Sequence, residues 1–586
     1  MKVRYRMGLG FAAVLLMTVT LSAAKTDIAD AAMRGDKAAL RTLLLDKGTN
    51  VNAAQSDGAT AVHWAVYRGD IEMLRMLTAA GANVKIANRN GSTPMWLAAT
   101  SGDPSIIRVL LDAGANPNET LPLGRTPLML ASKTGAVEAM KVLIDRGATL
   151  NARDTERGTT PLMWAADQGQ AAAVRLLIER GADVKAQSSP AARGRGPALG
   201  KSSDPRTSVR RQVDAIIAEQ KELPELSALR GNAGNADGND ANNGDDQNDA
   251  AAAAGGGGRG RQAQNDGGQL TSLIYATRAN SRETVQALLD AGADVNQISG
   301  YGWSPLLVAT QNRFYQLGKF LVEKGADPNL ANKGGWTPLY LATDNRNIEG
   351  GDYPVRPPDM DHLEYIKVLL AKGVDVNARM IDSSETRTVF TNQWLDERGA
   401  TAFLRASQSG DIELMRLLLA RGADPKIATN LNVTALQVAA GIGWVEGITS
   451  EHSTEKTLEA VRLLLDLGLD PNAQALTGRV ALHGAGHKGA TEVVKLLVAR
   501  GAKMDVRDWG NTDNRGSAEL AAHTWLPVDY ADGLVRVGVQ SAIPHPETGK
   551  VLRDLMKQAG LNPPPEGRIL DSICITEICS INYDPQ

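Results

Sequence analysis

Short apolar runs recur along the chain at a nearly fixed spacing, and glycine-rich polar segments separate them. Residues 91–118, 158–185 and 399–426 share one template, in which an apolar run, a glycine, a second apolar run and another glycine follow in order. Apolar runs of this length that end at glycine predict short helices, because glycine readily adopts the left-handed conformation of a helix C-cap. Each unit therefore predicts two helices joined by a turn and followed by a polar hairpin.

The start of each unit carries the residues that a helix N-terminus needs. A threonine hydroxyl can accept a hydrogen bond from a free backbone N–H, and a proline at the first helical position loses no bond there. This register places twelve caps, mostly 33 or 34 residues apart, at residues 26, 60, 93, 126, 160, 271, 304, 337, 401, 434, 480 and 526. The sequence therefore predicts about twelve repeats, with irregular units at both ends.

The template GSTPMWLAATSGDPSIIRVLLDAGANPN (91–118) resembles the ankyrin repeat. The resemblance implies an all-α ankyrin-repeat solenoid with β-hairpin fingers. Repeats 1–5 are expected in residues 25–186 and repeats 6–12 in residues 269–562, followed by a tail at 563–586. The overall arrangement also resembles long, signal-peptide-bearing ankyrin repeat proteins of bacteria, whose functions are mostly unassigned.

The N-terminal segment departs from the repeat pattern. Lys2, Arg4 and Arg6 precede an apolar run at residues 9–21, and small residues follow up to Ala24. This order is typical of a secretory signal peptide, so residues 1–24 are expected to be cleaved near Ala24 and the mature protein to be periplasmic or extracellular. The alternative is an uncleaved membrane anchor, although about 13 apolar residues span a bilayer poorly.

A polar stretch interrupts the two arrays at residues 187–268. Its second half is rich in Gly, Asn, Asp and Ala and has almost no apolar residue, so we expect a disordered insert. Val209, Val213, Ile216, Ile217 and Leu223 have helical spacing within it. The insert is therefore a tether between the two arrays, or it carries one amphipathic helix that is a docking element or a fragment packed on the solenoid.

The two cysteines of the chain, Cys574 and Cys579, lie close together near its end. In an exported protein such a pair indicates a disulfide; two free thiols or half of a metal site are the alternatives. The composition, with 43% hydrophobic residues, 22% charged residues and a formal charge of −3, favours neither nucleic acid nor membrane as a partner.

Enlarged loops distinguish the second half from the first. Repeats 8, 10 and 12 carry extra residues between their two helices, at 345–362, 441–455 and 532–549. Two fingers, 379–398 and 507–525, are also enlarged. The three inter-helix insertions should lie along one edge of the solenoid, and insertions that recur on one edge often mark a binding face. Simple tolerance of extra loop length is the alternative.

Aromatic and charged residues of the loops and finger tips are the candidate binding residues. Large aromatic side chains and arginines dominate interface energies. The candidates are Tyr301, Trp303, Trp336, Tyr353, Arg356, Trp444 and His452. For Trp303 and Trp336 the alternative is that they pack on each other between adjacent hairpins.

The variable positions of the first helices form the conventional partner surface of ankyrin proteins. They are Tyr67, Arg68, Lys133, Asp167, Gln168, Gln311, Asn312, Asp344, Asn345, Gln408 and Lys488.

Motifs of catalysis or metal binding are weak. His483 and His487 are four residues apart, but the glutamate of a zinc-protease motif does not accompany them. His483 and His63 share a template position at which ankyrin histidines bond to backbone. Asp359 and Asp361 could bind calcium, but they lack the Gly and Glu of a calcium loop. We expect no cofactor and no metal.

These observations favour an exported, monomeric scaffold that binds an unidentified protein partner through its concave face and its enlarged loops. An enzyme or small-ligand site formed by the inserted loops of repeats 8, 10 and 12 is the rival hypothesis. Polysaccharide binding by exposed tryptophans is a third.

Overall fold

A computed structural model describes residues 28–189, 268–347, 356–381, 395, 397–445, 452–508, 524–535 and 543–568. In these ranges the chain is helical and contains no strand; its β-pairing consists of isolated bridges, Ala54 with Thr60 and Gln187 with Thr271. The predicted all-α class is confirmed. The predicted β-hairpin fingers are polar turns, some closed by a single bridge, rather than paired strands.

Residue contacts divide the chain into two compact units. The first comprises residues 1–155, 160–165 and 172–182, and the second comprises 156–159, 166–171 and 183–586. Up to the end of repeat 5 the helices are α1 (Ile28–Arg34), α2 (Lys37–Leu45), α3 (Ala61–Tyr67), α4 (Ile71–Ala79), α5 (Pro94–Ser101), α6 (Pro104–Asp112), the 3-10 turn η1 (Pro122–Gly124), α7 (Pro127–Thr134), α8 (Val137–Asp145), α9 (Pro161–Asp167) and α10 (Ala171–Glu179).

Seven further helix pairs follow in the second unit, so the described residues contain twelve pairs in all, as predicted. Their bounds are α13 (Ser272–Arg278), α14 (Arg282–Asp290), α15 (Pro305–Gln311), α16 (Tyr315–Glu323), α17 (Pro338–Arg346), α18 (His362–Leu370), α19 (Ala402–Gln408), α20 (Ile412–Leu419), α21 (Ala435–Ala440), α22 (Thr454–Asp466), α23 (Ala481–Lys488), α24 (Thr491–Ala499), α26 (Pro527–Ala531) and α27 (Pro546–Gln558). Repeats 8, 9, 10, 11 and 12 are the pairs that begin with α17, α19, α21, α23 and α26.

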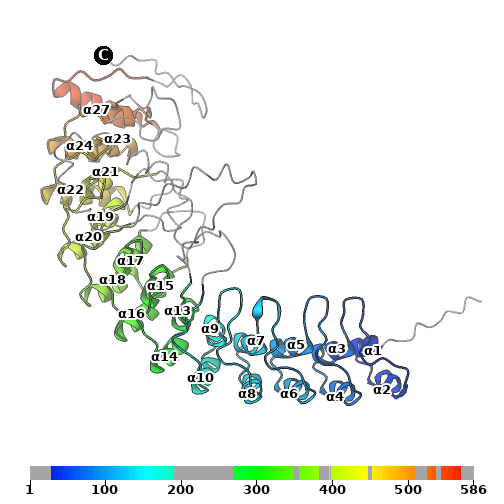
Figure 1. Cartoon of the computed structure of the whole chain (residues 1–586). Helices are drawn as coiled ribbons and strands as arrows, with labels where there is room; N and C mark the ends of the chain where they lie inside the picture. Colours follow the sequence, from blue (N-terminus) through cyan, green and yellow to red (C-terminus); the bar gives the residue numbers. More distant parts are fainter. Residues whose placement is uncertain are drawn as a thin grey trace, which may run out of the picture. The chain divides into compact units, whose positions relative to one another are not determined.

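Within each unit the first helices of successive repeats stack in one row and the second helices in another (Figure 1). The apolar core fills the space between the rows, with residues such as Leu74, Ile107 and Leu143 fully buried in the first unit. A repeat buries its apolar faces only against its neighbours. The side chains at each inter-helix turn therefore determine which contacts adjacent repeats make.

The predicted cap register is confirmed from residue 60 onward, because helices begin directly after each of those eleven positions. Thr93 shows the local reason: its hydroxyl oxygen accepts a hydrogen bond from the Trp96 N–H at 3.1 Å, and Pro94 follows it. The helix ends at Gly102, whose φ of 74° is left-handed. Position 26 lies outside the described residues, and the first helix begins at Ile28.

Asparagines at the base of the fingers tie successive repeats together. The side-chain oxygen of Asn118 accepts from the Thr149 N–H at 2.7 Å, while its amide donates to the Gly147 carbonyl at 2.8 Å. Asn472 repeats this arrangement in the second unit, with the Lys503 N–H at 2.8 Å. These bonds satisfy backbone groups at helix ends, which would otherwise lack partners.

The finger at the start of repeat 6 closes across the long insert. The Ser188 N–H donates to the Leu270 carbonyl at 2.9 Å, and the Gln269 N–H donates back to the Ser188 carbonyl at 2.8 Å. The predicted disorder of the insert falls mainly on residues 190–267, which lie outside the described residues, as do the predicted helix at 209–223, the signal peptide and the cysteines Cys574 and Cys579.

The last described residues are held on repeat 12 by a cluster of buried charges. Arg553 donates to the Pro564 carbonyl at 2.9 Å and pairs with Asp532 at 2.5 Å. Arg568 pairs with the same Asp532 at 2.6 Å and with Asp529 at 2.5 Å. The chain that follows α27 is therefore fixed at least as far as Arg568.

Candidate functional site

The inserted loops leave the solenoid where the sequence predicted. In repeat 8 the first helix ends at Arg346 and the second begins at His362, and in repeat 10 the corresponding bounds are Ala440 and Thr454. Repeat 9, between them, has only a short turn from Gln408 to Ile412. We call the inter-helix turns of repeats 8, 9 and 10 the loop edge.

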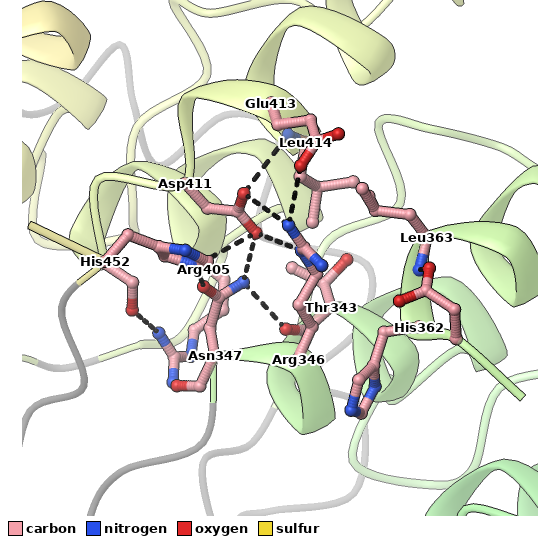
Figure 2. Close-up of polar contacts among 12 residues, drawn as sticks. Thr343, Arg346, Asn347, His362, Leu363, Arg405, Asp411, Glu413, Leu414 and His452 are labelled. Carbon is pink, nitrogen blue, oxygen red and sulfur yellow. Dashed lines mark hydrogen bonds and ion pairs between the residues drawn. The ribbon is translucent and has the colours of Figure 1, made fainter. Parts of the chain in front are cut away.

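A buried carboxylate, Asp411, stands at the centre of the loop edge (Figure 2). Its side chain is 1% exposed, and it caps α20 by accepting from the Leu414 N–H at 3.3 Å. Its other oxygen accepts from the Arg346 Nε at 2.7 Å. The capping role is readable in the sequence, but the ion pair with repeat 8 is a contact between residues 65 positions apart.

The two inserted loops meet at this carboxylate. Asn347, directly after α17, donates to Asp411 at 3.2 Å, and His452, two residues before α22, lies 3.5 Å from the same oxygen. The His452 Nε2 is also 3.1 Å from the Asn347 side-chain oxygen. The start of one loop and the end of the other are thus joined over the short turn of repeat 9 (Figure 2).

A second arginine, on the first helix of repeat 9, contacts the same turn. Arg405 of α19 pairs with Asp344 of α17 at 2.9 Å, donates to the Ser409 hydroxyl at 3.1 Å and hydrogen-bonds to the Asn347 carbonyl. Its side chain is 4% exposed. Buried guanidinium and carboxylate groups are stable only when their hydrogen bonds are satisfied, and here they are supplied mutually by repeats 8 and 9.

The electrostatics of the network keep Asp411 ionised. Burial alone would raise the pKa of a carboxyl group, but hydrogen bonds from His452 and Arg346 and the positive charge of Arg346 hold the pKa of Asp411 well below its usual value. The carboxylate is therefore a fixed negative charge that both loops contact. Arg346 also reaches Glu413 at 3.1 Å.

Arg356 marks the return of the repeat 8 loop to the described part of the chain. Its guanidinium lies 4.9 Å from the Phe314 ring, and its carbonyl accepts from Arg313 at 2.9 Å. Its side chain is exposed, as a binding residue requires. Asp359 and Asp361 accept backbone N–H groups of Gln316 and of α18, so both act in ordinary loop and cap contacts.

Trp444 in the repeat 10 loop is half-buried. Its ring meets the His487 ring edge-on, with centroids 5.9 Å apart, and His487 in turn faces Tyr530 of repeat 12. Beside them the His483 Nε2 lies 3.1 Å from the Trp525 carbonyl and its Nδ1 accepts from the Val480 N–H at 3.0 Å. His63 makes the equivalent contacts in the first unit, so the predicted backbone-bonding role of both histidines is confirmed.

Two of the three finger-tip candidates do not lie on an accessible surface. Trp336 is 3% exposed and Tyr301 is 5% exposed, and Trp303 packs, half-buried, against the apolar cluster that contains Trp336 and Tyr340. The expectation that they are offered at the tips is wrong for Trp336 and Tyr301, because both rings are buried. Apolar residues of neighbouring fingers and first helices cover Trp336. A partner cannot reach these two rings without moving the fingers.

The first helices also differ from expectation. In the second unit Asn345 is 1% exposed and Gln408 is 4% exposed, because they hold neighbouring repeats. Asn345 donates to the Thr310 carbonyl at 2.7 Å. In the first unit Tyr67 is 74% exposed. Of the remaining candidates, Tyr353 lies outside the described residues.

Sequence reasoning missed the organising residues of the loop edge, namely Arg346, Asn347, Arg405 and Asp411. Only the N-cap position of Asp411 was visible as a local pattern. Among the described residues, no group of three or more His, Cys, Asp or Glu side chains could hold a metal ion. In the same ranges no helix is long and apolar enough to cross a membrane.

Comparison with family models agrees with this architecture. A family model described as ankyrin repeats in three copies matches residues 28–120, 113–188, 273–380 and 403–508. The crystal structure of the human ASB11 ankyrin repeat domain shares 21% sequence identity, with 51% of this chain and 98% of that domain covered and a TM-score of 0.33.

Two curated proteins match short stretches only. Serine/threonine-protein kinase 12 of Arabidopsis thaliana is 39% identical over 61 residues, which is 10% of this chain and 13% of the kinase. Protein PhlB of Serratia liquefaciens is 46% identical over 50 residues, which is 8% of this chain and 22% of that protein. The chain thus spans less than a quarter of either relative.

Proposed function

Because the chain belongs to the ankyrin repeat family, we propose that it is an exported, non-enzymatic scaffold that binds a protein partner at the loop edge of its second unit. Ankyrin repeats typically serve as protein-binding scaffolds, and a fold alone does not name the ligand. The proposal therefore rests on the site, and export rests on the pattern of residues 1–24.

One observation carries the proposal: the loops of repeats 8 and 10 share a buried anchor, Asp411. Loops that are merely tolerated need no common anchor, and burying a carboxylate with two arginines nearby is costly unless each is paired. An anchor such as Asp411 holds the ends of both loops in place, which lowers the entropy that the loops lose when a partner binds. Arg356 and Trp444 are described candidates in these two loops, and their own contacts are with Phe314 and His487.

The test is capture of the partner by the full-length chain from the exported fraction, followed by mass spectrometry. Wild-type protein should retain a specific partner, and Trp444→Ala or Arg356→Ala should weaken its retention about thirtyfold if either residue is a central anchor. The matched control is Tyr67→Ala, an exposed aromatic of the first unit, which should retain the partner. The opposite pattern, with Tyr67 required and the loop residues dispensable, excludes the loop edge.

Export is tested separately on the protein purified from cells. The N-terminus of the mature protein should be Lys25, and the denatured, unreduced protein should have no titratable thiol because Cys574 and Cys579 are joined. An intact Met1, or two free thiols, would contradict these expectations.

A further inference from the structure

After its last helix the chain turns back and binds its own twelfth repeat. α27 ends at Gln558, and the Leu561 N–H donates to the Met556 carbonyl at 2.9 Å, which closes the helix end. The residues that follow contact α27 and the inter-helix turn between α26 and α27. We call residues 564–568, with the sequence Pro-Pro-Glu-Gly-Arg, the tail strap.

A guanidinium on α27 binds the proline pair of the tail strap. The Arg553 Nε donates to the Pro564 carbonyl at 2.9 Å, and its Nη2 donates to the Pro565 carbonyl at 3.0 Å. A proline has no backbone N–H, so its backbone can be recognised only through the carbonyl, and arginine is a side chain that only donates. Proline also restricts the backbone of the free segment, which lowers the entropy that the segment loses on binding.

Two buried aspartates bind the arginine at the other end of the tail strap. The Arg568 guanidinium lies 2.5 Å from Asp529 and 2.6 Å from Asp532, and these carboxylates are 4% and 11% exposed. Asp532 also pairs with Arg553 at 2.5 Å. If Arg568 were removed, two carboxylates would face one guanidinium in this cluster. A buried excess of negative charge is costly unless a cation balances it.

The face of α27 that receives the tail strap leaves room for these charged groups. Gly549 and Arg553 are four residues apart, so they lie on the same face of the helix. A Cβ on Gly549 would be 2.9 Å from the Asp532 carboxylate and 3.1 Å from the Arg553 guanidinium. A larger residue at this position would therefore displace the groups that bind the strap.

We propose that the inter-helix turn of repeat 12 is a binding site for an extended segment of the pattern Pro-Pro-x-x-Arg, which the tail strap occupies until a partner's segment of the same pattern replaces it. Arg553 binds the proline carbonyls, and Asp529 and Asp532 bind the arginine. The tail strap is a ligand bound within its own chain, and its chemistry defines the partner. This site lies outside the loop edge and does not depend on the proposed function.

The charges of the site favour a cationic protein segment over an anionic ligand. Asp529 and Asp532 repel phosphates and carboxylates, and the one arginine of α27 at the site is already paired with Asp532. A second copy of the chain carries the same strap, so exchange of tails between two copies is the competing outcome. Because the strap is joined to α27 by a short connection, its effective concentration at the site is roughly millimolar, and a free segment must compete with it.

The probe is a fluorescent peptide with the sequence of residues 561–568, Leu-Asn-Pro-Pro-Pro-Glu-Gly-Arg, compared with a peptide that ends in Glu instead of Arg. Binding to the full-length protein is measured by fluorescence anisotropy. The wild type should bind the arginine peptide weakly, because its own strap competes. Arg568→Glu places a like charge beside the two aspartates and releases the strap, so this variant should bind the peptide about tenfold more tightly or better. The double variant D532N/R568E should lose that gain.

The matched control is Arg500→Glu, which breaks an exposed ion pair with Asp466 at 2.8 Å between repeats 10 and 11 and leaves the strap in place. It should bind the peptide as weakly as wild type. The arginine peptide should also raise the melting temperature of Arg568→Glu, whereas the glutamate peptide should not. Arg568→Gln, a milder change, should show a smaller gain of the same kind.

Three results would each overturn the proposal. They are absence of peptide binding by folded Arg568→Glu and Arg568→Gln, an equal gain in Arg500→Glu, and a wild-type dimer in light scattering that Arg568→Glu converts to a monomer. The last result would assign the site to the tail of a second copy. No loop-edge residue takes part in the peptide assay, so its outcome is independent of the capture experiment.

Discussion

Aromatic residues of this chain have very different surroundings according to which neighbour covers them. Trp336 precedes a helix cap and packs edge-on against Tyr340, with ring centroids 5.1 Å apart, inside a cluster built from several repeats. Tyr67 ends a first helix and is 74% exposed. Residue type alone does not separate the two cases, because a large aromatic ring is suited to a core and to an interface alike.

Trp336→Ala should destabilise the second unit substantially. Loss of a buried tryptophan removes its transfer free energy and leaves a cavity, which costs about 3–5 kcal/mol. Tyr67→Ala should change the free energy of unfolding by less than about 0.5 kcal/mol, as exposed substitutions do. Urea titrations followed by circular dichroism compare the two variants; equal midpoints would mean that the Trp336 finger is loose in solution.

Asp411→Asn should weaken the fold more than its small chemical change suggests. The substitution leaves Arg346 largely buried without its closest negative partner, and breaking such a pair costs about 3–5 kcal/mol. Glu413→Gln is the matched control, because Glu413 touches the same arginine but is 62% exposed and should contribute under about 1 kcal/mol. Thermal melts of both variants test this, and similar melting points would contradict a central role for Asp411.

Acid should destabilise the second unit through its buried histidines. Burial, with the nearby Arg479 charge as a smaller cause, lowers the pKa of both His483 and His487 from 6.5 to about 4. Since the folded pKa lies below the unfolded value, their contribution to stability is complete above pH 6.5 and is lost as the pH falls toward 4. The expected loss is roughly 3 kcal/mol per histidine.

The measurement is the urea midpoint of the full chain between these pH values. His487→Gln removes one titrating group and should make the midpoint less dependent on pH than in wild type. An unchanged pH dependence in this variant would assign the effect to other groups.

At the scale of helices, much of the architecture was predictable because its causes are local. Thr-Pro at a helix start and glycine at a helix end act through their own backbone, so the positions of the helices could be read from residues such as Thr93, Pro94 and Gly102. The place of the inserted loops followed from the same register. A loop that breaks the period between two helices must leave the solenoid at their turn.

What could not be predicted depends on contacts between repeats. Asp411 has the sequence context of an ordinary N-cap, and nothing beside it indicates Arg346 or His452 as partners. Likewise, the sequence offers Tyr301 and Trp336 as finger-tip candidates, with packing between adjacent hairpins as the alternative for Trp336, and the structure buries both. The cluster that buries Trp336 gathers residues of several repeats, and a single sequence does not specify such contacts.

At the scale of the whole molecule, the long insert should be dispensable for folding. Replacing residues 190–266 with a short Gly/Ser linker should leave the helical circular dichroism and the melting midpoint nearly unchanged, because the backbone hydrogen bonds of Ser188 lie outside the replaced segment. Ser188→Pro is the informative control, since proline removes the N–H that bonds to Leu270. Loss of cooperative unfolding in the linker protein would show that residues 209–223 are part of the solenoid.

The closed finger at Ser188 also determines how well the chain tolerates insertions and deletions of sequence. Its two flanks are held together by their own hydrogen bonds, so any polypeptide that leaves and returns there begins and ends at nearly the same point. For a flexible chain, each doubling of such an excursion adds only about 0.6 kcal/mol of closure entropy. The finger is therefore a place where sequence can be gained, lost or exchanged with little effect on stability, and where a reporter domain could be grafted between the two flanks.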